Sequence, residues 1–148
     1  MEYGLIGEKL GHSFSREIHN LLASYTYDLK ELPKNELDTF MKSRNFKGVN
    51  VTIPYKESVI PYLDEIDEAA KAIGAVNTIV NREGRLIGYN TDFYGMRELL
   101  LSRSIRIEKR FVAVLGTGGT SKTACAVAKS LGASRIVRVS RNPHSDGG

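Results

Sequence analysis

Cysteine, long apolar runs and the features of an export signal are all scarce in this sequence. Only one of its 148 residues is cysteine, Cys125, which excludes an intrachain disulfide and a cysteine-based metal cluster. No apolar run approaches the roughly 20 residues of a membrane-spanning helix. The N-terminal stretch MEYGLIGEKL lacks the basic and long apolar regions of a signal peptide. We therefore expect a cytoplasmic protein with no metal site and no membrane partner.

Charge is unevenly distributed along the chain. Residues 1–103 carry 13 lysines and arginines against 15 acidic residues, whereas residues 104–148 carry 8 against 2. Such asymmetry can mark a nucleic-acid-binding tail. Here the basic residues are dispersed among apolar runs such as FVAVLG and RIVRV, and no basic-aromatic motif accompanies them. We expect no nucleic-acid partner and favour a phosphorylated ligand.

Hydrophobic periodicity predicts strands that alternate with helices, which is typical of an α/β protein with a mostly parallel sheet. Val49, Val51 and Ile53 would share one face of the clearest strand. A helix is expected after the first strand, where Ile18, Leu21, Leu22 and Tyr25 recur at helical spacing. The other expected elements are strands over 3–7, 26–32 and 47–54, helices over 34–44, 64–73 and 91–103, and a hairpin formed by 76–81 and 85–89.

A second unit follows the polar connector 104–110. An apolar strand (111–116), a turn and helix (117–132) and another strand (134–142) make one βαβ unit. About 40 residues are too few for an independently stable domain, and two strands leave a sheet edge unpaired. We therefore expect a first domain over 1–103, and over 104–148 the incomplete start of a Rossmann domain in a longer protein.

The glycine-rich turn LGTGGTS predicts a pyrophosphate site. Gly116 and Gly118 match the first two glycines of G-x-G-x-x-G, and Ser121 in the third place is still small enough for close helix–strand packing. Backbone N–H groups of the turn, including Gly119 and Thr120, can approach a pyrophosphate at the helix N-terminus. A tight packing turn without a ligand is the alternative.

The end of the second strand predicts which dinucleotide binds. An NAD site has an acidic residue there to bind the ribose 2′-hydroxyl. This chain has Ser140, Arg141 and Asn142 instead. Arg141 suits a 2′-phosphate, with Ser140 or Asn142 assisting, so NADP is favoured; a solvated surface arginine is the alternative.

Polar side chains also gather at the ends of the predicted strands in the first unit, where α/β proteins place ligand contacts. Each has a structural alternative, such as a helix cap for Ser15 or a solvated charge for Lys56. Spacing alone does not show whether Lys56 and Asp92 meet. The candidates are Ser13, Ser15, Thr52, Lys56, Asn77 and Asp92.

Five motifs, in this order and at this spacing, resemble the shikimate dehydrogenase family. They are GEKLGHSFSREIHN, GVNVTIPYK, GAVNTIV, GYNTDFYG and VLGTGGTSKTA. The resemblance implies a shikimate-binding substrate domain followed by an NADP-binding Rossmann domain. It also implies reversible reduction of 3-dehydroshikimate to shikimate by NADPH, a step of aromatic amino-acid biosynthesis.

The same resemblance implies substrate contacts residue by residue. Ser13 and Ser15 match the pair that binds the shikimate carboxylate. Thr52 matches a further substrate contact. Asn77 and Asp92 match ligands of the ring hydroxyls.

Lys56 and Asp92 resemble the catalytic pair of the family. Hydride arriving at a carbonyl carbon leaves negative charge on the oxygen, and a positioned ammonium can stabilise that charge and deliver a proton. A nearby carboxylate can hold the lysine and bind an adjacent hydroxyl. We expect Lys56 to be the acid/base and Asp92 its partner, although the resemblance leaves open which of them moves the proton.

Two features depart from the family pattern. Arg16 stands where the family usually has proline, which is preorganised for a first helical turn. A cation there is also unfavourable beside the positive helix end, unless a bound carboxylate offsets it. The chain also lacks the nicotinamide-binding half of the Rossmann domain and a late glutamine contact, so we expect it to be inactive or weakly active as given.

Two other functions stay open. A quinate/shikimate dehydrogenase that uses NAD is one, and Arg141 argues against it. A non-catalytic module of the same fold that binds a carboxylate is the other, and Lys56 with Asp92 argues against it. All three functions require a small-molecule carboxylate; the sequence does not set the oligomeric state, and a homodimer is one option.

Overall fold

The computed structural model describes residues 1–140, which fall into two compact units. The first comprises residues 1–71 and 75–90, and the second comprises residues 72–74 and the chain from residue 91 on. The domain boundary after residue 103 that the sequence predicts stays a prediction. Across residues 1–140, no helix combines the length and the apolar character needed to cross a membrane.

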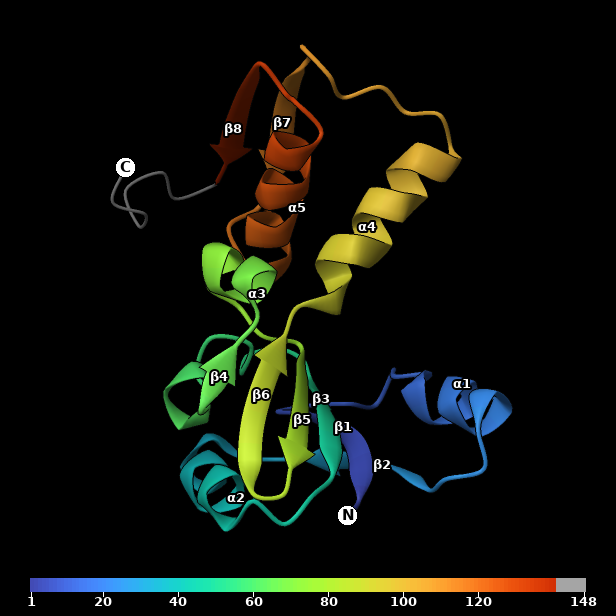
Figure 1. Ribbon diagram of the computed structural model, residues 1–148, viewed down its shortest axis with the longest axis vertical. Coiled ribbons are helices and arrows are strands. Elements are labelled where there is room, and N and C mark those ends of the chain that lie inside the picture. The colour runs from blue at the N-terminus through green and yellow to red at the C-terminus, as the bar shows by residue number, and fades with distance from the viewer. Residues whose placement is uncertain (141–148) are drawn as a thin grey trace. The chain divides into compact units, whose positions relative to one another are not determined.

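The first unit is built on a mixed six-stranded sheet (Figure 1). The strand order is β2-β1-β3-β5-β6-β4. Strand β1 pairs in parallel with both β2 and β3, and β4 pairs in parallel with β6, while β3–β5 and β5–β6 are antiparallel. The strands are β1 (Tyr3–Gly7), β2 (Tyr27–Glu31), β3 (Gly48–Val51), β4 (Glu65–Ile66), β5 (Thr78–Arg82) and β6 (Arg85–Tyr89).

Three helices accompany this sheet: α1 (Ser15–Leu22), α2 (Leu37–Ser43) and α3 (Glu68–Ile73). A 3₁₀ turn, Lys34–Glu36, leads into α2. Helix α1 follows β1 as the sequence predicts, but it ends before Tyr25 and buries none of its residues. Its apolar stripe is exposed, because none of the described elements covers it. The exposed fraction of Leu21, for example, is 89%.

The helix predicted over 64–73 is wrong in its first part. Glu65 and Ile66 pair with β6 as strand β4. The backbone N–H of Asp67 then donates to Gly88 O, and its carboxylate accepts the N–H of Ala69 at 3.1 Å. An aspartate that bonds forward in this way starts a helix, so α3 begins only at Glu68.

The strand predicted over 47–54 is shorter than its alternation indicated. Val49 and Val51 are buried, but Ile53 is 75% exposed and lies outside β3. Pro54, joined to Ile53 by a cis peptide bond, has no N–H to continue a ladder. Regular pairing of β3 ends at Val51, and one further bond, from the Thr52 N–H to Ile6 O, follows it.

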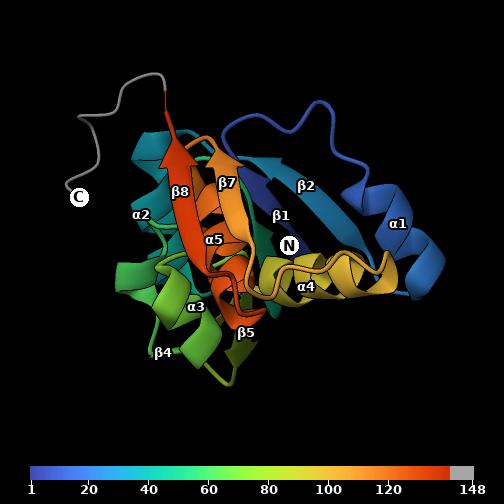
Figure 2. The same cartoon turned by 90° about the horizontal axis from the view of Figure 1, so that it is seen from above.

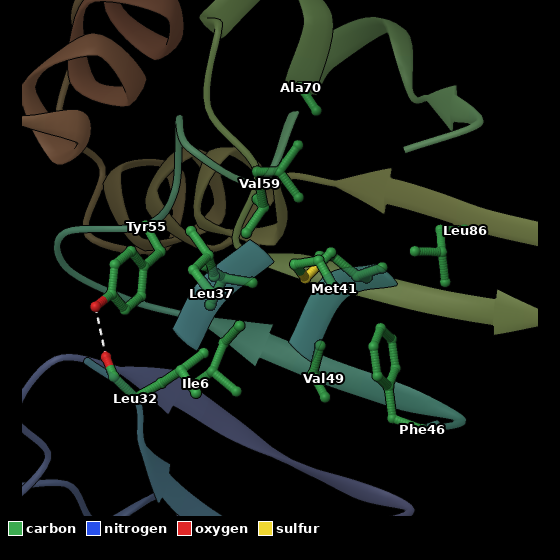
Figure 3. Packing of buried hydrophobic residues seen from close by; sticks show 13 residues of the cluster. Ile6, Leu32, Leu37, Met41, Phe46, Val49, Tyr55, Val59, Ala70 and Leu86 are labelled. Atoms are coloured by element: carbon green, nitrogen blue, oxygen red, sulfur yellow. Dashed lines mark hydrogen bonds between the residues drawn. The ribbon is translucent and has the colours of Figure 1, made fainter. Parts of the chain in front are cut away.

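The main core lies between the sheet, helix α2 and the loop after β3 (Figure 3). Leu37 and Met41 of α2 belong to the same buried cluster as Ile6 and Val49 of the sheet. The Tyr55 hydroxyl donates to Leu32 O at 2.5 Å, and burial raises the pKa of this phenol. The buried Tyr55 thus anchors the loop that also carries its neighbour Lys56.

The second unit contains the βαβ arrangement that the sequence predicts (Figure 2). Strands β7 (Phe111–Leu115) and β8 (Arg135–Val139) pair in parallel, and α5 (Gly119–Ser130) connects them. Helix α4 (Thr91–Ser102) contacts α5. The two-stranded sheet is thinly covered in the described residues, where Leu115 is 81% exposed.

One carboxylate, Asp64, joins helix α2 to the β5–β6 hairpin. It accepts the backbone N–H of Leu86 at 2.7 Å and the guanidinium of Arg44 at 2.8 and 3.2 Å. Arg44, in the left-handed conformation after α2, also donates to Gly84 O. The hydrogen bond from the Leu86 N–H, and to a smaller extent the one from the Arg44 guanidinium, holds the pKa of Asp64 below its usual range.

We expect Asp64→Asn to lower the melting temperature at neutral pH. Because the pKa of Asp64 is lower in the folded than in the unfolded chain, its stabilisation is present above the unfolded value of about 3.8 and is lost as pH falls toward the folded value. The difference in melting temperature between the variant and the wild type should therefore become smaller in acid, which circular dichroism melts at several pH values would measure. Asp38→Asn, which removes a surface pair with Lys42, is the control and should have a smaller effect. A difference that does not vary with pH would contradict the assignment.

Candidate functional site

The two predicted serines meet at the start of helix α1. Ser13 Oγ lies 3.1 Å from Ser15 Oγ and accepts the backbone N–H of Ser15 at 3.2 Å. Ser15 is the first helical residue, and the capping position, Phe14, makes no side-chain cap bond. Both serines are half-buried. Two hydroxyls beside a helix N-terminus are well suited to hold an anion.

The loop that carries these serines is tied to the carboxyl ends of β2 and β3. The N–H of Leu10 donates to Glu31 Oε1 at 2.8 Å, and the N–H of Glu8 donates to Ile53 O at 3.3 Å. Leu10 O in turn accepts the N–H of Ser13 at 2.9 Å. The serine pair is thereby held near the end of the sheet from which Thr52 and Ile53 emerge.

Thr52, Lys56 and Asn77 are held at that same end by backbone hydrogen bonds. The N–H of Thr52 donates to Ile6 O at 2.9 Å, which extends the β1–β3 pairing by one residue. Lys56 O accepts the N–H of Val76 at 2.7 Å, immediately before Asn77. The structure therefore gathers four predicted substrate residues and Lys56 around the ends of β1 and β3 and the start of β5.

Asn77 belongs to a chain of side-chain hydrogen bonds that the sequence analysis missed. Its side chain is buried, with 7% of the residue exposed, and its Oδ1 accepts the hydroxyl of Thr78 at 3.0 Å. Behind Thr78 lie Asn50 and Tyr27. Asn50 bonds Asn77 and Thr78, which lie 27 and 28 positions further along the chain, so no local sequence signal points to this chain of bonds.

Arg16, the residue that departs from the family pattern, docks α1 onto the edge of the sheet. Its Nε donates to Tyr27 O at 3.3 Å. One turn later the His19 ring stacks on the Tyr27 ring, with centroids 3.8 Å apart, and His19 Nδ1 lies 2.5 Å from the Tyr25 hydroxyl. The guanidinium thus has a carbonyl partner that offsets its unfavourable position near the helix N-terminus.

Asp92 belongs to the second unit, whereas the other predicted substrate residues belong to the first. It is the second residue of α4, which belongs to the second unit. Lys56 belongs to the first unit. The pairing of Lys56 with Asp92 therefore stays a prediction.

The glycine turn has the local geometry of a phosphate-binding loop. Gly116 has φ of +110°, which favours glycine, and its N–H donates to Val139 O at 2.9 Å. Gly118 is extended and precedes α5, and a Cβ there would meet no atom within 4 Å. The buried Ser121 hydroxyl donates to Gly118 O at 2.8 Å. Open backbone at a helix N-terminus fits a pyrophosphate.

The residues predicted to select NADP are only partly described. Ser140 follows β8 and is half-buried. Arg141 and Asn142 lie outside the described residues. Thr120 is exposed in the first turn of α5. The turn and Ser140 are thus compatible with a dinucleotide, and the choice between NADP and NAD stays a prediction.

Comparison with known proteins gives one consistent family. The family model described as the shikimate dehydrogenase substrate binding domain matches residues 5–79. A protein from Clostridium beijerinckii named shikimate dehydrogenase (NADP(+)) is 46% identical over 147 residues, which cover 94% of this chain and 54% of the relative. The chain therefore spans about half the length of the relatives it matches.

Solved structures agree with the sequence match. Shikimate dehydrogenase 1 from Peptoclostridium difficile superposes with a TM-score of 0.92 at 37% identity, over 99% of this chain and 58% of that one. Shikimate 5-dehydrogenase from Thermus thermophilus, solved in complex with NADP(H) and shikimate, gives 0.86 at 31% identity, over 97% of this chain and 57% of that one. This chain, with its mixed sheet and following βαβ unit, belongs to the shikimate dehydrogenase family.

Proposed function

We propose that this chain is the shikimate-binding part of an NADP-dependent shikimate dehydrogenase, an oxidoreductase of the shikimate pathway, together with the start of its cofactor domain. The observation that carries the proposal is the Ser13–Ser15 hydroxyl pair, 3.1 Å apart at the start of α1. The Thermus thermophilus relative, solved with shikimate and NADP(H), supports the choice of ligand. The domain limits 1–103 and 104–148 belong to the same proposal.

The serine pair would receive the substrate carboxylate. Both hydroxyls can donate to carboxylate oxygens, and the N-terminal backbone of α1 adds positive potential. The ring would then extend toward Thr52 and Asn77, whose backbones are hydrogen-bonded into the same end of the sheet. A small hydroxylated carboxylate satisfies both groups of contacts.

Lys56 would act on the reacting oxygen. NADPH supplies the hydride when it is bound. The carbonyl oxygen of 3-dehydroshikimate then gains negative charge, and the Lys56 ammonium stabilises it and delivers the proton that completes the alcohol. In the reverse direction the neutral amine takes that proton back. Asp92 would hold Lys56 and bind a neighbouring hydroxyl.

The glycine turn would hold the cofactor pyrophosphate through backbone N–H groups that follow Gly116, including those of Gly119 and Thr120, because the Gly116 N–H already donates to Val139 O. Ser140, Arg141 and Asn142 would hold the 2′-phosphate of NADP. Because about half the length of the relatives lies outside this chain, we expect little or no turnover from these 148 residues alone. Comparing the rates of the complete enzyme with NADP and NAD tests the cofactor choice.

Shikimate binding tests the substrate assignment directly. We expect calorimetry to detect binding to the wild-type chain and about a tenfold loss of affinity for Ser15→Ala, the loss of one hydrogen bond to a charged group. Ser43→Ala, which removes an exposed hydroxyl on α2, is the matched control. Equal affinity of the Ser15→Ala variant and the wild type would refute the serine site.

Lys56→Ala tests the proposed acid/base in the complete enzyme. We expect kcat to fall about 10²- to 10⁴-fold, as for loss of a general acid, while shikimate still binds. NADPH oxidation in the presence of 3-dehydroshikimate measures the rate. Lys34→Ala removes an exposed lysine of the 3₁₀ turn before α2 and serves as the control. Near-normal turnover of Lys56→Ala would overturn the assignment.

Gly7→Ala tests the position of Thr52. A Cβ at Gly7 would lie 2.6 Å from Thr52 Cγ2 and 2.8 Å from Leu10 Cδ2, so both side chains must move. We expect a loss of about 1–3 kcal/mol in the free energy of unfolding and weaker shikimate binding. Gly11→Ala, in the same loop, meets no atom within 4 Å and should change neither quantity. Denaturant titration and calorimetry measure the two effects.

A further inference from the structure

A continuous hydrogen-bond relay runs through the first unit to Asn77. The Tyr27 hydroxyl donates to Asn50 Oδ1 at 2.7 Å. Asn50 Nδ2 donates to the Thr78 hydroxyl at 3.0 Å, and that hydroxyl donates to Asn77 Oδ1 at 3.0 Å. These bonds join β2, β3 and β5 on the side of the sheet opposite the main core, where Tyr27 also packs with Leu5 and Leu10. The relay ends on a residue that we assign to the substrate.

The chemistry of the relay gives it one direction. Asn50 Nδ2 also lies 3.4 Å from the backbone carbonyl oxygen of Asn77. A carbonyl oxygen only accepts hydrogen bonds, so the Asn50 atom beside it must be the amide nitrogen. Thr78 Oγ1 then accepts from Asn50 and has its own proton left to donate. Thr78 donates that proton to Asn77 Oδ1, so the carboxamide oxygen of Asn77, and not its nitrogen, faces Thr78.

The relay begins at the Tyr27 hydroxyl, which donates a hydrogen bond to Asn50. The Tyr27 side chain is buried beneath the stacked His19 ring. Burial, with a smaller effect of Tyr25, raises the pKa of Tyr27 to about 12. The phenol therefore keeps its proton at neutral pH, where it can donate to Asn50 Oδ1.

We propose that Tyr27, Asn50 and Thr78 form a positioning relay that fixes the Asn77 carboxamide with its oxygen toward Thr78, so that the substrate meets Asn77 as a hydrogen-bond donor. An N–H donor binds either an alcohol or a ketone oxygen, because both accept hydrogen bonds. A flipped carboxamide would bind only the alcohol. The relay therefore suits a site that must hold both the oxidised and the reduced form of one ring.

The inference rests on the proposed function, because it assumes that shikimate contacts Asn77. The decisive change is Thr78→Val, which removes the hydroxyl and keeps the branched shape. We expect shikimate affinity to fall about tenfold, since the loss of one oriented hydrogen bond has this order of effect. Thr78→Ser keeps the hydroxyl and should recover most of that affinity.

A second ligand separates positioning from general structural damage. Cyclohex-1-ene-1-carboxylate has the carboxylate for the serine pair but no ring hydroxyl to reach Asn77. Calorimetry should show that Thr78→Val leaves its affinity within about twofold, because no hydrogen bond of this ligand depends on the relay. Thr39→Val, which removes an exposed threonine hydroxyl on α2, should change neither affinity. Equal losses for the two ligands, or a Thr78→Ser variant as weak as Thr78→Val, would overturn the proposal.

The ligand-free chain gives an independent measurement. The two Asn77 side-chain amide protons should be separate, slowly exchanging NMR signals in the wild type and in Thr78→Ser. In Thr78→Val they should broaden and exchange faster, because the carboxamide is no longer held. Unchanged signals would refute the relay. If the wild type binds neither ligand, the proposed function fails, and these amide signals alone then decide whether the relay orients Asn77.

Discussion

The parallel pairing of β1 with β2 on one side and β3 on the other is the constraint on which the rest of the first unit depends. Because all three strands run the same way, their carboxyl ends meet at one edge. The loops that leave that edge carry the serine pair, Thr52 and Lys56. The bond from Thr52 N–H to Ile6 O carries this pairing one residue past β3 and into the candidate site.

The two faces of this sheet have different roles. The core side buries Val49, Val51 and Ile79 against α2, and Tyr55 hydrogen-bonds into the same core. On β3, Asn50 alternates with these valines, so it lies opposite the core and reaches Thr78 and Tyr27. Apolar packing thus places the backbone, whereas the polar relay orients a single carboxamide.

Much of the fold could be predicted because its signals are local. Alternation in KGVNVTIP, the helix N-terminus after HSFS and the glycine turn after FVAVLG each lie within a few residues. Predictions were wrong where a distant partner decided the outcome. Glu65 and Ile66 form a strand because they pair with β6, which lies further along the chain. The candidate site followed the same division: the serine pair and the glycine turn were visible, and the relay behind Asn77 was not.

The sequence by itself determined the family, the order of the elements and the residue types at the candidate site, because motifs of a few residues encode strand ends, turns and helix starts. Only the tertiary structure decided which way the Asn77 carboxamide faces and what Arg16 does. Both depend on Tyr27, whose hydroxyl bonds Asn50 and whose carbonyl accepts from Arg16. Contacts between residues 11 to 28 positions apart arise when strands pair, and no short stretch of sequence contains them.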